Sequence, residues 1–424
     1  MKDFSQSLFY DVLLTEEEKR IRDEVESFVK NEVPSELIRK MDVEEVVFPS
    51  DFIKAAAEKR LLGLRFPSEY GGRNATWVAE VAAIEQVGVL GFTLSCQYSM
   101  PSIVGEALNL FGTSEQKRKY LEPMLKGELY SAEAITDPSG GSDVFGAMKL
   151  VAKKEGNHYV LNGEKRFVVG GEGADFFIVY AKTNPKAVPP QTGVSTFIVE
   201  RDFGVKVATV YGLLGTRGGG TARIVFKDVK VPEENLLGKE NGGYDVFNRM
   251  MVPERMTSAA GAIGTAIGAL EVAVKYSSLR KAFGRKIKDF QGVSFKVSDS
   301  IMKIDAARGL VYTAARMADE GVNLGRLRRV VAESKAFATE AAWETVNHAM
   351  QILGGIGYTT VYPIERLFRD LRLSLIWTGT NEIMRAIIQH EIYKEILNPE
   401  YLERRRNIEL DTVGFHLEEE KVYE

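Results

Sequence analysis

The chain has 424 residues, of which 45% are hydrophobic and 27% charged, and its formal net charge is −4. This length and apolar content are typical of a soluble protein of about three domains, and the charge gives no reason to expect a nucleic acid or an acidic membrane surface as partner. A single cysteine, Cys96, excludes an internal disulfide framework, and four widely spaced histidines form no metal-ligand pattern, so we expect no metal site.

The sequence also gives no sign of a targeting or membrane segment. No apolar run is expected to be long enough to span a bilayer. The first four residues, Met1–Phe4, lack the basic start and apolar stretch of a signal peptide. The simplest prediction is a cytoplasmic protein without membrane insertion.

Residues 1–130 are predicted to form an all-α domain. Thr15 and Glu18 have the spacing of a capping box at a helix start, and Thr113 and Gln116 repeat that spacing later. Thr76 is expected to open a further helix whose apolar residues share one face.

Residues 131–243 are predicted to form a compact antiparallel β-domain, because short β-rich runs alternate there with turn residues. Leu150–Lys153 and His158–Leu161 are the first such pair. Asn162-Gly163 then has the composition of a two-residue hairpin turn. The periodicity in this section changes from helical to strand-like, which marks a domain boundary.

Residues 244–396 return to alanine-rich helical patterns and are predicted to form a four-helix bundle. The expected long helices are Ser258–Leu279, Phe290–Asp319, Leu327–Leu353 and Thr380–Ile396. Residues 397–424 form a charged tail whose sequence leaves open whether it is mobile or packs on a neighbour. The predicted fold class is therefore α+β, with an all-α domain, a β-domain and a helical bundle in that order.

Four motifs follow each other along the chain: Ala134–Asp143, Arg280–Gly284, Gln351–Tyr358 and Gly379–Ile383. The first is a polar loop that exposes backbone N–H groups and lets a bulky ligand approach the main chain. Alone, such a cluster is more often a simple turn. Together and in this order, the motifs resemble the acyl-CoA dehydrogenase family of flavoproteins, over roughly residues 10–395.

The resemblance implies FAD bound between the β-domain and the helical bundle. In the first loop, Thr136 would contact the flavin ring, and Ser142 would contact both the cofactor and the pantetheine of the substrate. Ile135 and Gly141 belong to the same predicted contact group. The alternative is that these residues only stabilise a turn.

The second flavin strand in the family carries an aromatic residue followed two positions later by a threonine. Here Phe167 takes the aromatic place, and Val169 stands where the threonine is expected. The missing hydroxyl removes one polar contact worth about 0.5–1.5 kcal/mol net. This departure puts the redox potential of the flavin in question, but not flavin binding. Phe167 and Val169 are also compatible with an ordinary strand core.

The remaining cofactor residues would reach FAD from an adjacent subunit. A guanidinium suits a pyrophosphate because it donates in a planar fork without losing its charge. The resemblance gives this role to the first residue of the second motif, and the full group comprises Arg280, Phe283, Gln291, Gln351, Gly354, Gly355, Thr380 and Glu382. The two glycines could instead simply end the preceding helix.

The position of the catalytic base departs from the commoner family pattern. Most members have a glutamate directly before the Gly-Thr of the last motif, where this chain has Thr378, which cannot act as a base at neutral pH. A minority, including the isovaleryl- and long-chain-type enzymes, carry the glutamate before an arginine at the start of the bundle. Glu254-Arg255 fits that variant.

By itself, Glu254 would be interpreted as a helix N-terminal acid favoured by the helix dipole. With the resemblance, Glu254 is the predicted base, and the backbone N–H of Thr378 is a predicted donor to the thioester carbonyl. Arg255 is expected to face the CoA phosphates or to support the helix start. Phe92, Leu94 and Tyr98 are candidate contacts of an apolar acyl group, in a stretch without the arginine that glutaryl-type relatives keep.

The function implied is FAD-dependent α,β-dehydrogenation of an apolar acyl-CoA, with a branched, cyclic or medium- to long-chain acyl group. A base would remove the α-proton while the β-hydrogen leaves as a hydride. The resemblance further implies an electron-transfer flavoprotein as electron acceptor and a homotetramer built as a dimer of dimers. Two alternatives stay open: an acyl-CoA oxidase-like enzyme that uses oxygen, and a non-catalytic relative that binds acyl-CoA or FAD.

Overall fold

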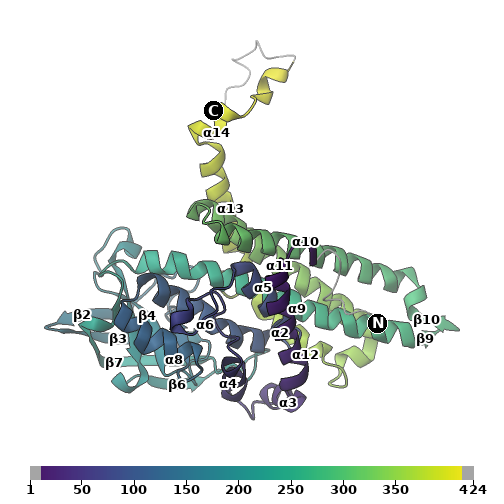
Figure 1. Cartoon of the computed structure of the whole chain (residues 1–424), viewed down its shortest axis with the longest axis horizontal. Coiled ribbons are helices and arrows are strands. Elements are labelled where there is room, and N and C mark those ends of the chain that lie inside the picture. The colour runs from purple at the N-terminus through teal and green to yellow at the C-terminus, as the bar shows by residue number, and fades with distance from the viewer. Residues whose placement is uncertain (1–10, 413–424) are drawn as a thin grey trace.

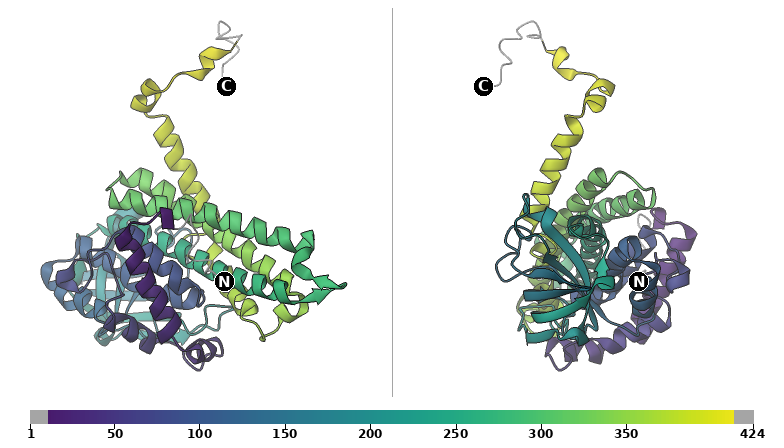
Figure 2. Two further views of the ribbon diagram at one scale, coloured as in Figure 1. Left: turned by 45° about the vertical axis from the view of Figure 1, so that its right-hand side comes forward. Right: turned by 90° about the vertical axis from the view of Figure 1, so that its left-hand side faces the viewer.

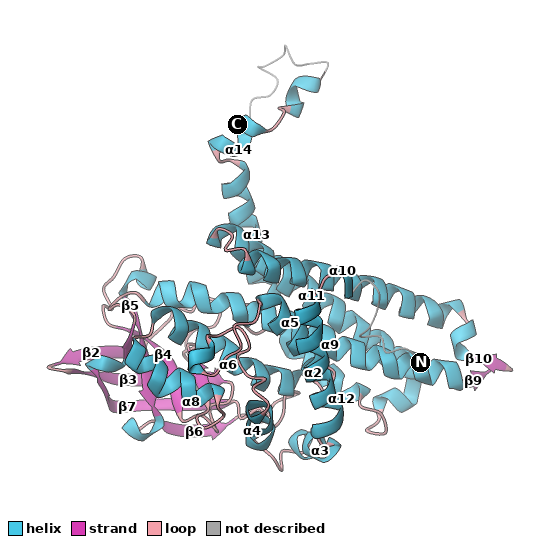
Figure 3. Ribbon diagram, in the orientation of Figure 1, coloured by secondary structure: helices cyan, strands magenta, loops and turns pink. Residues whose placement is uncertain are grey.

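The computed structural model describes residues 11–412. A helical N-terminal section, a β-domain and a second helical section follow each other along the chain (Figure 1). The strands gather at one end of the molecule, and a small β-hairpin forms the tip of the other end (Figure 3). The predictions for Met1–Phe4 and for the last part of the tail concern residues outside the described range.

The N-terminal section is helical, as predicted. Its helices are α2 (Glu16–Glu32), α3 (Ser35–Asp42), α4 (Ser50–Glu58), α5 (Trp77–Gly88), α6 (Phe92–Phe111), α7 (Ser114–Gln116) and α8 (Glu122–Leu125). Both capping boxes are confirmed: Thr15 N donates to Glu18 Oε2 at 2.8 Å, and the side chains of Thr113 and Gln116 answer each other's backbone in the same way. Thr76 caps α5 by accepting a hydrogen bond from Ala79 N.

The β-domain is one mixed sheet in the order β6-β7-β3-β2-β4-β5-β8. The remaining strand, β1, pairs with β4 and is not part of this linear order. Its strands are β1 (Ser131–Ala134), β2 (Val151–Glu155), β3 (His158–Val168), β4 (Phe176–Lys182), β5 (Val194–Glu200), β6 (Lys206–Val210), β7 (Ala222–Pro232) and β8 (Leu236–Leu237). Most pairs are antiparallel as predicted, whereas β1 and β2 run parallel to β4.

The predicted turn at Asn162-Gly163 is wrong. Both residues lie inside β3, where the pairing with β7 shifts register between Leu161 and Gly163. The Asn162 side chain bonds to the backbone N–H and the carboxylate of Asp228 across the sheet, at 3.0 and 3.1 Å. Gly163 provides the positive φ that this irregularity needs. Long-range pairing therefore overrides the local turn signal, and the real hairpin turn is at Gly156-Asn157.

The C-terminal section contains the long helices α9 (Gly243–Leu279), α10 (Gln291–Asp319) and α11 (Leu324–Leu353), with the short α12 (Ile364–Leu371) beside them. The hairpin of β9 (Lys281–Ala282) and β10 (Arg285–Lys286) joins α9 to α10. The helix α13 (Asn381–Ile396) leaves the body of the molecule and continues towards α14 (Pro399–Arg404), as Figure 2 shows from two sides.

Contrary to the expectation from sequence, α9 is long and apolar enough to cross a membrane by length and composition. However, 78% of its most apolar window is buried inside the protein. It packs against α5, α6, α10 and α11 and thus serves as the central helix of the core. This burial explains why the helix is apolar all round.

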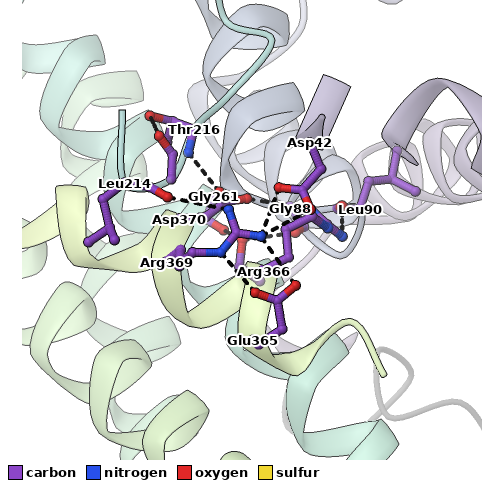
Figure 4. Close-up of polar contacts among 12 residues, drawn as sticks. Asp42, Gly88, Leu90, Leu214, Thr216, Gly261, Glu365, Arg366, Arg369 and Asp370 are labelled. Carbon is purple, nitrogen blue, oxygen red and sulfur yellow. Dashed lines mark hydrogen bonds and ion pairs between the residues drawn. The ribbon is translucent and has the colours of Figure 1, made fainter. Parts of the chain in front are cut away.

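A charged cluster on α12 ties the three sections together (Figure 4). Arg369 donates to Asp42 from the N-terminal section at 2.8 Å and to the carbonyl of Leu214 from the β-domain at 3.3 Å. Its neighbour Asp370 accepts a hydrogen bond from Thr216 N at 2.7 Å. We call this set, with Glu365 and Arg366, the α12 junction. It fixes the β-domain relative to both helical sections.

Besides the core around α9, an apolar cluster joins the β-domain to the helices, and we call it the second apolar cluster. It forms the surroundings of the candidate site. Its members come from α6, β4 and α9, and include Met100, Ile103, Ile178, Tyr180 and Met250. A sheet face covered by two helices in this way leaves little room for a polar side chain without a partner. Polar groups that nevertheless lie here are therefore candidates for a functional role.

Candidate active site

Glu254 is a half-buried residue of the central helix α9, one helical turn after Met250 of the second apolar cluster. Its Oε2 atom is buried and accepts no hydrogen bond from an N–H group or a hydroxyl. Burial raises the pKa of Glu254 to about 7, and this rise is moderated by a hydrogen bond with Glu133 and by the charges of Arg255 and Lys335. A carboxyl with a pKa near neutrality can accept a proton at physiological pH.

The turn that contains Thr378 lies beside the start of the bundle, as the predicted role requires. Thr378 has a φ of 56°, which is strained for a β-branched residue. Arg255, the neighbour of Glu254, donates from Nε to the Thr378 carbonyl at 3.3 Å. The Thr378 hydroxyl is buried without a partner. The structure therefore brings Glu254, Arg255 and Thr378 into one region.

Two buried cations hold the backbone of this turn. Besides Arg255, Lys335 on α11 donates to the Gly379 carbonyl at 2.9 Å and to Asn381 Oδ1 at 2.8 Å. Burial lowers the pKa of Arg255 to about 10, and burial together with the nearby Arg255 charge lowers the pKa of Lys335 to about 7. Arg255 is 5% exposed and holds the Thr378 turn. The expected helix start at Glu254-Arg255 is wrong, because α9 already begins at Gly243 and both residues lie in its interior.

The first loop is anchored by a buried ion pair. Lys165 on β3 donates to Asp137 Oδ1 at 2.6 Å and to the Ile135 carbonyl at 2.7 Å. Asp137 in turn accepts the backbone N–H groups of Lys149 and Leu150. Burial lowers the pKa of Lys165 to about 8, and the Asp137 carboxylate opposes that change. The loop thus keeps a fixed shape while Gly141 and Ser142 at its tip stay exposed.

The end of β3 presents Phe167 and buries part of Val169. Phe167 is 51% exposed, has a φ of 56°, and packs against Tyr211 with ring centroids 5.1 Å apart. Val169 packs against the second apolar cluster. The backbone N–H of Arg166 donates to the Thr136 carbonyl at 2.8 Å, so this strand end and the first loop lie side by side.

Two residues of the second group of predicted cofactor residues meet at the opposite end of the bundle, whereas Thr380 and Glu382 follow the Thr378 turn. Arg280 and Gly355 line one open hollow of about 570 Å³, together with Tyr276, Leu353 and Tyr362. Phe283 at the hairpin tip is 94% exposed and has a φ of 51°.

The other predicted residues of this group occupy exposed positions or cap helices. Gln291 begins α10, and Gln351 is exposed on the last turn of α11. Gly354 ends α11 with a φ of 65°. Thr380 caps α13 by accepting from Ile383 N at 3.3 Å. Glu382 is exposed in the first turn of α13, where a hydrogen bond with its own backbone N–H lowers its pKa.

The three predicted acyl contacts are core residues of α6. Phe92 packs edge-on against Trp377, with ring centroids 5.3 Å apart, which places it beside the Thr378 turn. Leu94 is 2% exposed, and the Tyr98 hydroxyl donates to the Leu61 carbonyl at 2.6 Å, towards the N-terminal helices. Contact with substrate stays a prediction for all three.

The sequence reasoning missed four polar residues of this region: the half-buried Glu133 and the buried Lys165, Tyr180 and Lys335. Glu133 lies on β1 opposite Ile178. Burial and the neighbouring Glu254 raise the pKa of Glu133 well above its usual range. Burial and the charges of Glu133 and Glu254 also raise the pKa of Tyr180. A glutamate in the short run Ser131–Ala134, flanked by small residues, is the one signal that could have drawn attention.

The residues present fit an FAD molecule. A Cβ atom placed on Gly141, Gly284, Gly354 or Gly355 would meet nothing within 4 Å, so these backbones are open to a large ligand. Three of the nine non-glycine residues with positive φ, among residues 11–412, are predicted cofactor or substrate residues: Phe167, Phe283 and Thr378. Backbone strain of this kind concentrates at functional sites.

Three acyl-CoA dehydrogenase domains match the chain: the N-terminal domain at residues 15–128, the middle domain at 132–229 and the C-terminal domain at 241–393. A short-chain-specific acyl-CoA dehydrogenase of Clostridium acetobutylicum is 36% identical over 389 residues, covering 91% of this chain and 100% of the relative. The mitochondrial isovaleryl-CoA dehydrogenase of Pongo abelii is 34% identical, with 88% of each chain covered.

The caffeyl-CoA reductase-Etf complex subunit CarC of Acetobacterium woodii is 34% identical, covering 90% of this chain and 99% of the relative. These relatives span several substrate classes. The similarity therefore does not select the isovaleryl- and long-chain-type subgroup that the glutamate position had suggested.

Solved structures agree in fold. A chain from a study of the electron transferring flavoprotein of Acidaminococcus fermentans has a TM-score of 0.85 at 35% identity, covering 89% of this chain and 98% of that chain. Butyryl-CoA dehydrogenase from Megasphaera elsdenii has a TM-score of 0.83 at 30% identity, covering 90% and 99%.

The FAD complex of PigA has a TM-score of 0.84 at 28% identity, again covering 90% and 99%. Domain matches along almost the whole chain, similar full-length relatives and the same three-part architecture agree with the site described above. The chain belongs to the acyl-CoA dehydrogenase family of FAD-dependent oxidoreductases that act on CH–CH bonds.

Proposed function

We propose that this protein removes hydrogen from Cα and Cβ of an apolar acyl-CoA thioester, with Glu254 as the base that takes the α-proton. The observation that carries the proposal is the carboxyl of Glu254 on the central helix α9, which has a buried Oε2 atom and a pKa raised to about 7 by burial. Thr378 occupies the place that holds the base in most of the family and offers no carboxylate.

The backbone N–H of Thr378 is the proposed donor that stabilises the negative charge formed on the substrate. Removal of an α-proton puts negative charge on the thioester oxygen, and a fixed N–H donor stabilises that charge. A backbone donor does not depend on the side chain, so a threonine can stand here. Arg255 and Lys335 hold the carbonyls of Thr378 and Gly379, which keeps the turn rigid for this task.

FAD, when bound, supplies the oxidant for the hydrogen that leaves Cβ. The first loop and Phe167 would hold the flavin end, because the loop offers the hydroxyls of Thr136 and Ser142 and lies beside the end of β3, where the Phe167 ring is exposed. Arg280 and Gly355 would hold the diphosphate and adenosine end, since a guanidinium and an open backbone suit phosphate.

These two groups belong to different ends of one chain, since the hairpin next to Arg280 is the tip furthest from the β-domain (Figure 1). We therefore propose that each FAD is held by two subunits and that the protein is a homotetramer, a dimer of dimers. The projecting α13 and α14 support such an assembly, because Tyr393, Leu397 and Leu402 are more than half exposed there.

The acyl group is proposed to be apolar, and branched, cyclic or of medium to long chain. The second apolar cluster supports that class, because it includes Met100 and Met250, and Met250 lies one helical turn before Glu254 on α9. Relatives are named for short-chain and isovaleryl substrates, so chain length is the property to measure first.

The electron acceptor is proposed to be an electron-transfer flavoprotein in the cytoplasm. This rests on a similar relative named as part of a reductase-Etf complex and on a similar chain studied with such a flavoprotein. An oxidase that uses oxygen is the alternative, and peroxide release measured against flavoprotein reduction separates the two.

One experiment tests the proposed function. The purified protein is expected to be yellow, with about one FAD per chain, and an apolar saturated acyl-CoA should bleach the flavin anaerobically. A panel of straight, branched and cyclic acyl-CoAs ranks the substrates. A flavin that binds normally and that no acyl-CoA of the panel reduces would contradict the proposal.

A further inference from the structure

Glu133 is a half-buried residue with one buried carboxyl oxygen, and the proposed reaction gives it no role. It lies on β1, where Ala132 and Ala134 point into the interior cluster of the β-domain. Because side chains alternate along a strand, Glu133 shares the opposite face with Ile135, which packs on the second apolar cluster. Glu133 therefore faces the same region between β-domain and helices as Glu254.

The two carboxyl side chains lie within hydrogen-bonding reach of each other, although they come from β1 and α9. Glu133 Oε1 and Glu254 Oε2 are both buried, and neither accepts a hydrogen bond from an N–H group or a hydroxyl. Two carboxylates cannot both ionise cheaply at such a separation, whereas one shared proton provides the missing donor.

The charged groups that face this pair do not replace that proton. Lys165 on β3 is held by Asp137 and the Ile135 carbonyl, and Arg255 on α9 bonds to the Thr378 carbonyl. Lys335 on α11 bonds to the Gly379 carbonyl and Asn381. Tyr180 on β4 directs its hydroxyl to the sulfur of Met250 at 3.5 Å.

We propose that Glu133 stays protonated at working pH and donates a hydrogen bond to the Glu254 carboxylate, so that it acts as a positioning residue for the base. This inference rests on the proposed function of Glu254. The donated bond fixes the Glu254 side chain and leaves its other carboxylate oxygen for the α-proton. In the proton transfer, the C–H bond of Cα breaks, Glu254 gains the proton, and Glu133 keeps its own.

The direction of the two pKa shifts agrees with this division. Burial and the neighbouring Glu254 raise the pKa of Glu133 well above its usual range, so Glu133 is the member that keeps the proton. Burial raises the pKa of Glu254 to about 7, and the hydrogen bond from Glu133 limits that rise. A donor to the ionised form favours ionisation, which makes Glu254 available as a base at neutral pH.

Two substitutions distinguish a protonated Glu133 that donates a hydrogen bond from an ionised Glu133 that only adds negative charge. Glu133→Gln keeps a donor of similar size and is expected to leave the pH profile of flavin reduction within about 0.3 pH unit of wild type. Glu133→Leu removes the donor and should move the acidic limb of kcat/KM up by about one pH unit, with roughly tenfold slower reduction at pH 6.

Glu128→Gln, at an exposed glutamate shortly before β1, is the matched control and should behave as wild type. Infrared difference spectra recorded without substrate supply a readout independent of turnover. A carboxylic-acid C=O band of the wild type should persist through neutral pH and disappear in both Glu133 variants.

Two results would overturn the inference. If Glu133 were ionised, both substitutions would move the acidic limb down, because each removes a negative charge beside the base. If it were only structural, neither would move the limb. Failure of the proposed function itself looks different: Glu254→Gln would then reduce its flavin at the wild-type rate. A slow Glu254→Gln with unshifted Glu133 variants contradicts the Glu133 assignment alone.

Discussion

The α12 junction and the Glu133–Glu254 pair are two groups of buried charges with opposite design. In the junction (Figure 4), Arg369 has acceptors from three sections of the chain, and Asp370 is matched by Thr216 N and Arg366. In the pair, two acids face each other and each keeps a buried oxygen that accepts no hydrogen bond from an N–H group or a hydroxyl.

Burial raises the pKa of Asp370 as it raises that of Glu254, although Arg366, Thr216 N and Arg369 oppose the rise at Asp370. The cation of the junction shows the difference between the two regions. Burial works against the charge of Arg369, but hydrogen bonds to Glu365 and Asp42 raise its pKa above the ordinary value. Burial raises the pKa of Glu254 to about 7, and hydrogen bonding only moderates the rise. Matched charges stabilise the fold, whereas the mismatched acid is held ready to take up a proton. This is the pattern expected at an active site.

The largest effect is expected for Glu254→Gln, which keeps the size of the side chain and removes the base. The rate of flavin reduction by the best acyl-CoA should fall at least about 10²- to 10⁴-fold, because general base catalysis supplies about that factor. Stopped-flow absorbance measures the rate, and an unchanged FAD spectrum controls for cofactor loss. A loss of activity that only follows loss of FAD would contradict this prediction.

Breaking the junction should affect stability instead of chemistry. Asp370→Ala leaves Thr216 N and Arg366 without their carboxylate in a buried place, at a cost of about 2–4 kcal/mol in the free energy of unfolding. Denaturant unfolding measures this cost. The rate of flavin reduction per bound FAD should stay near wild type.

Asp299→Ala, at an exposed aspartate on α10, serves as control. If Asp370→Ala kept wild-type stability and lost most of its rate of flavin reduction, the α12 junction would serve the reaction and not the stability of the fold.

The same comparison predicts that removing the base stabilises the protein at alkaline pH. The pKa of Glu254 is about 7 in the folded state, against 4.5 for an ordinary glutamate. A raised folded-state pKa gives stability that is complete below pH 4.5 and is lost as pH rises through 7. At pH 8, the free energy of unfolding of Glu254→Gln should therefore be about 1–3 kcal/mol higher than that of wild type.

At pH 4 that gain should vanish. Thermal unfolding at the two pH values measures it, with Glu128→Gln as control. Equal stability of Glu254→Gln and wild type at both pH values would mean that folding does not raise the pKa of Glu254.

A smaller effect is expected at the far end of the bundle. Arg280→Ala removes a proposed phosphate contact from the hollow and should weaken FAD binding about 10- to 100-fold. FAD titration of the apoprotein by fluorescence measures the affinity, and Lys288→Ala in the same exposed segment is the matched control. Unchanged affinity in Arg280→Ala would leave the hollow without a role in cofactor binding.

Sequence patterns predicted those features that depend on neighbouring residues. The capping boxes at Thr15 and Thr113 were found because the partners lie three residues apart. The turn predicted at Asn162-Gly163 failed because Asp228, distant in sequence, bonds to Asn162 within the sheet. Helix α3 is not among the expected helices, because Pro34 precedes its start and no side chain caps it.

The candidate site shows the same limit. Arg280 and Gly355 could be predicted because their motifs are local, and the structure places both around one hollow. Glu133, Lys165 and Lys335 could not, because a single charged residue in a strand or helix normally faces water. Only the packing of β1, β3 and α11 against the remaining fold buries them and makes their charges matter.

The central claim is that Glu254 takes the α-proton, and exchange of that proton with solvent tests it most directly. A saturated acyl-CoA is incubated anaerobically with the holoenzyme in D₂O, and NMR follows deuterium uptake at Cα. Wild type should exchange the α-hydrogen with a rate that rises through about pH 7, where Glu254 ionises, and Glu254→Gln should exchange at least about 100-fold more slowly. Exchange by Glu254→Gln at the wild-type rate, with the same pH dependence, would show that another group is the base.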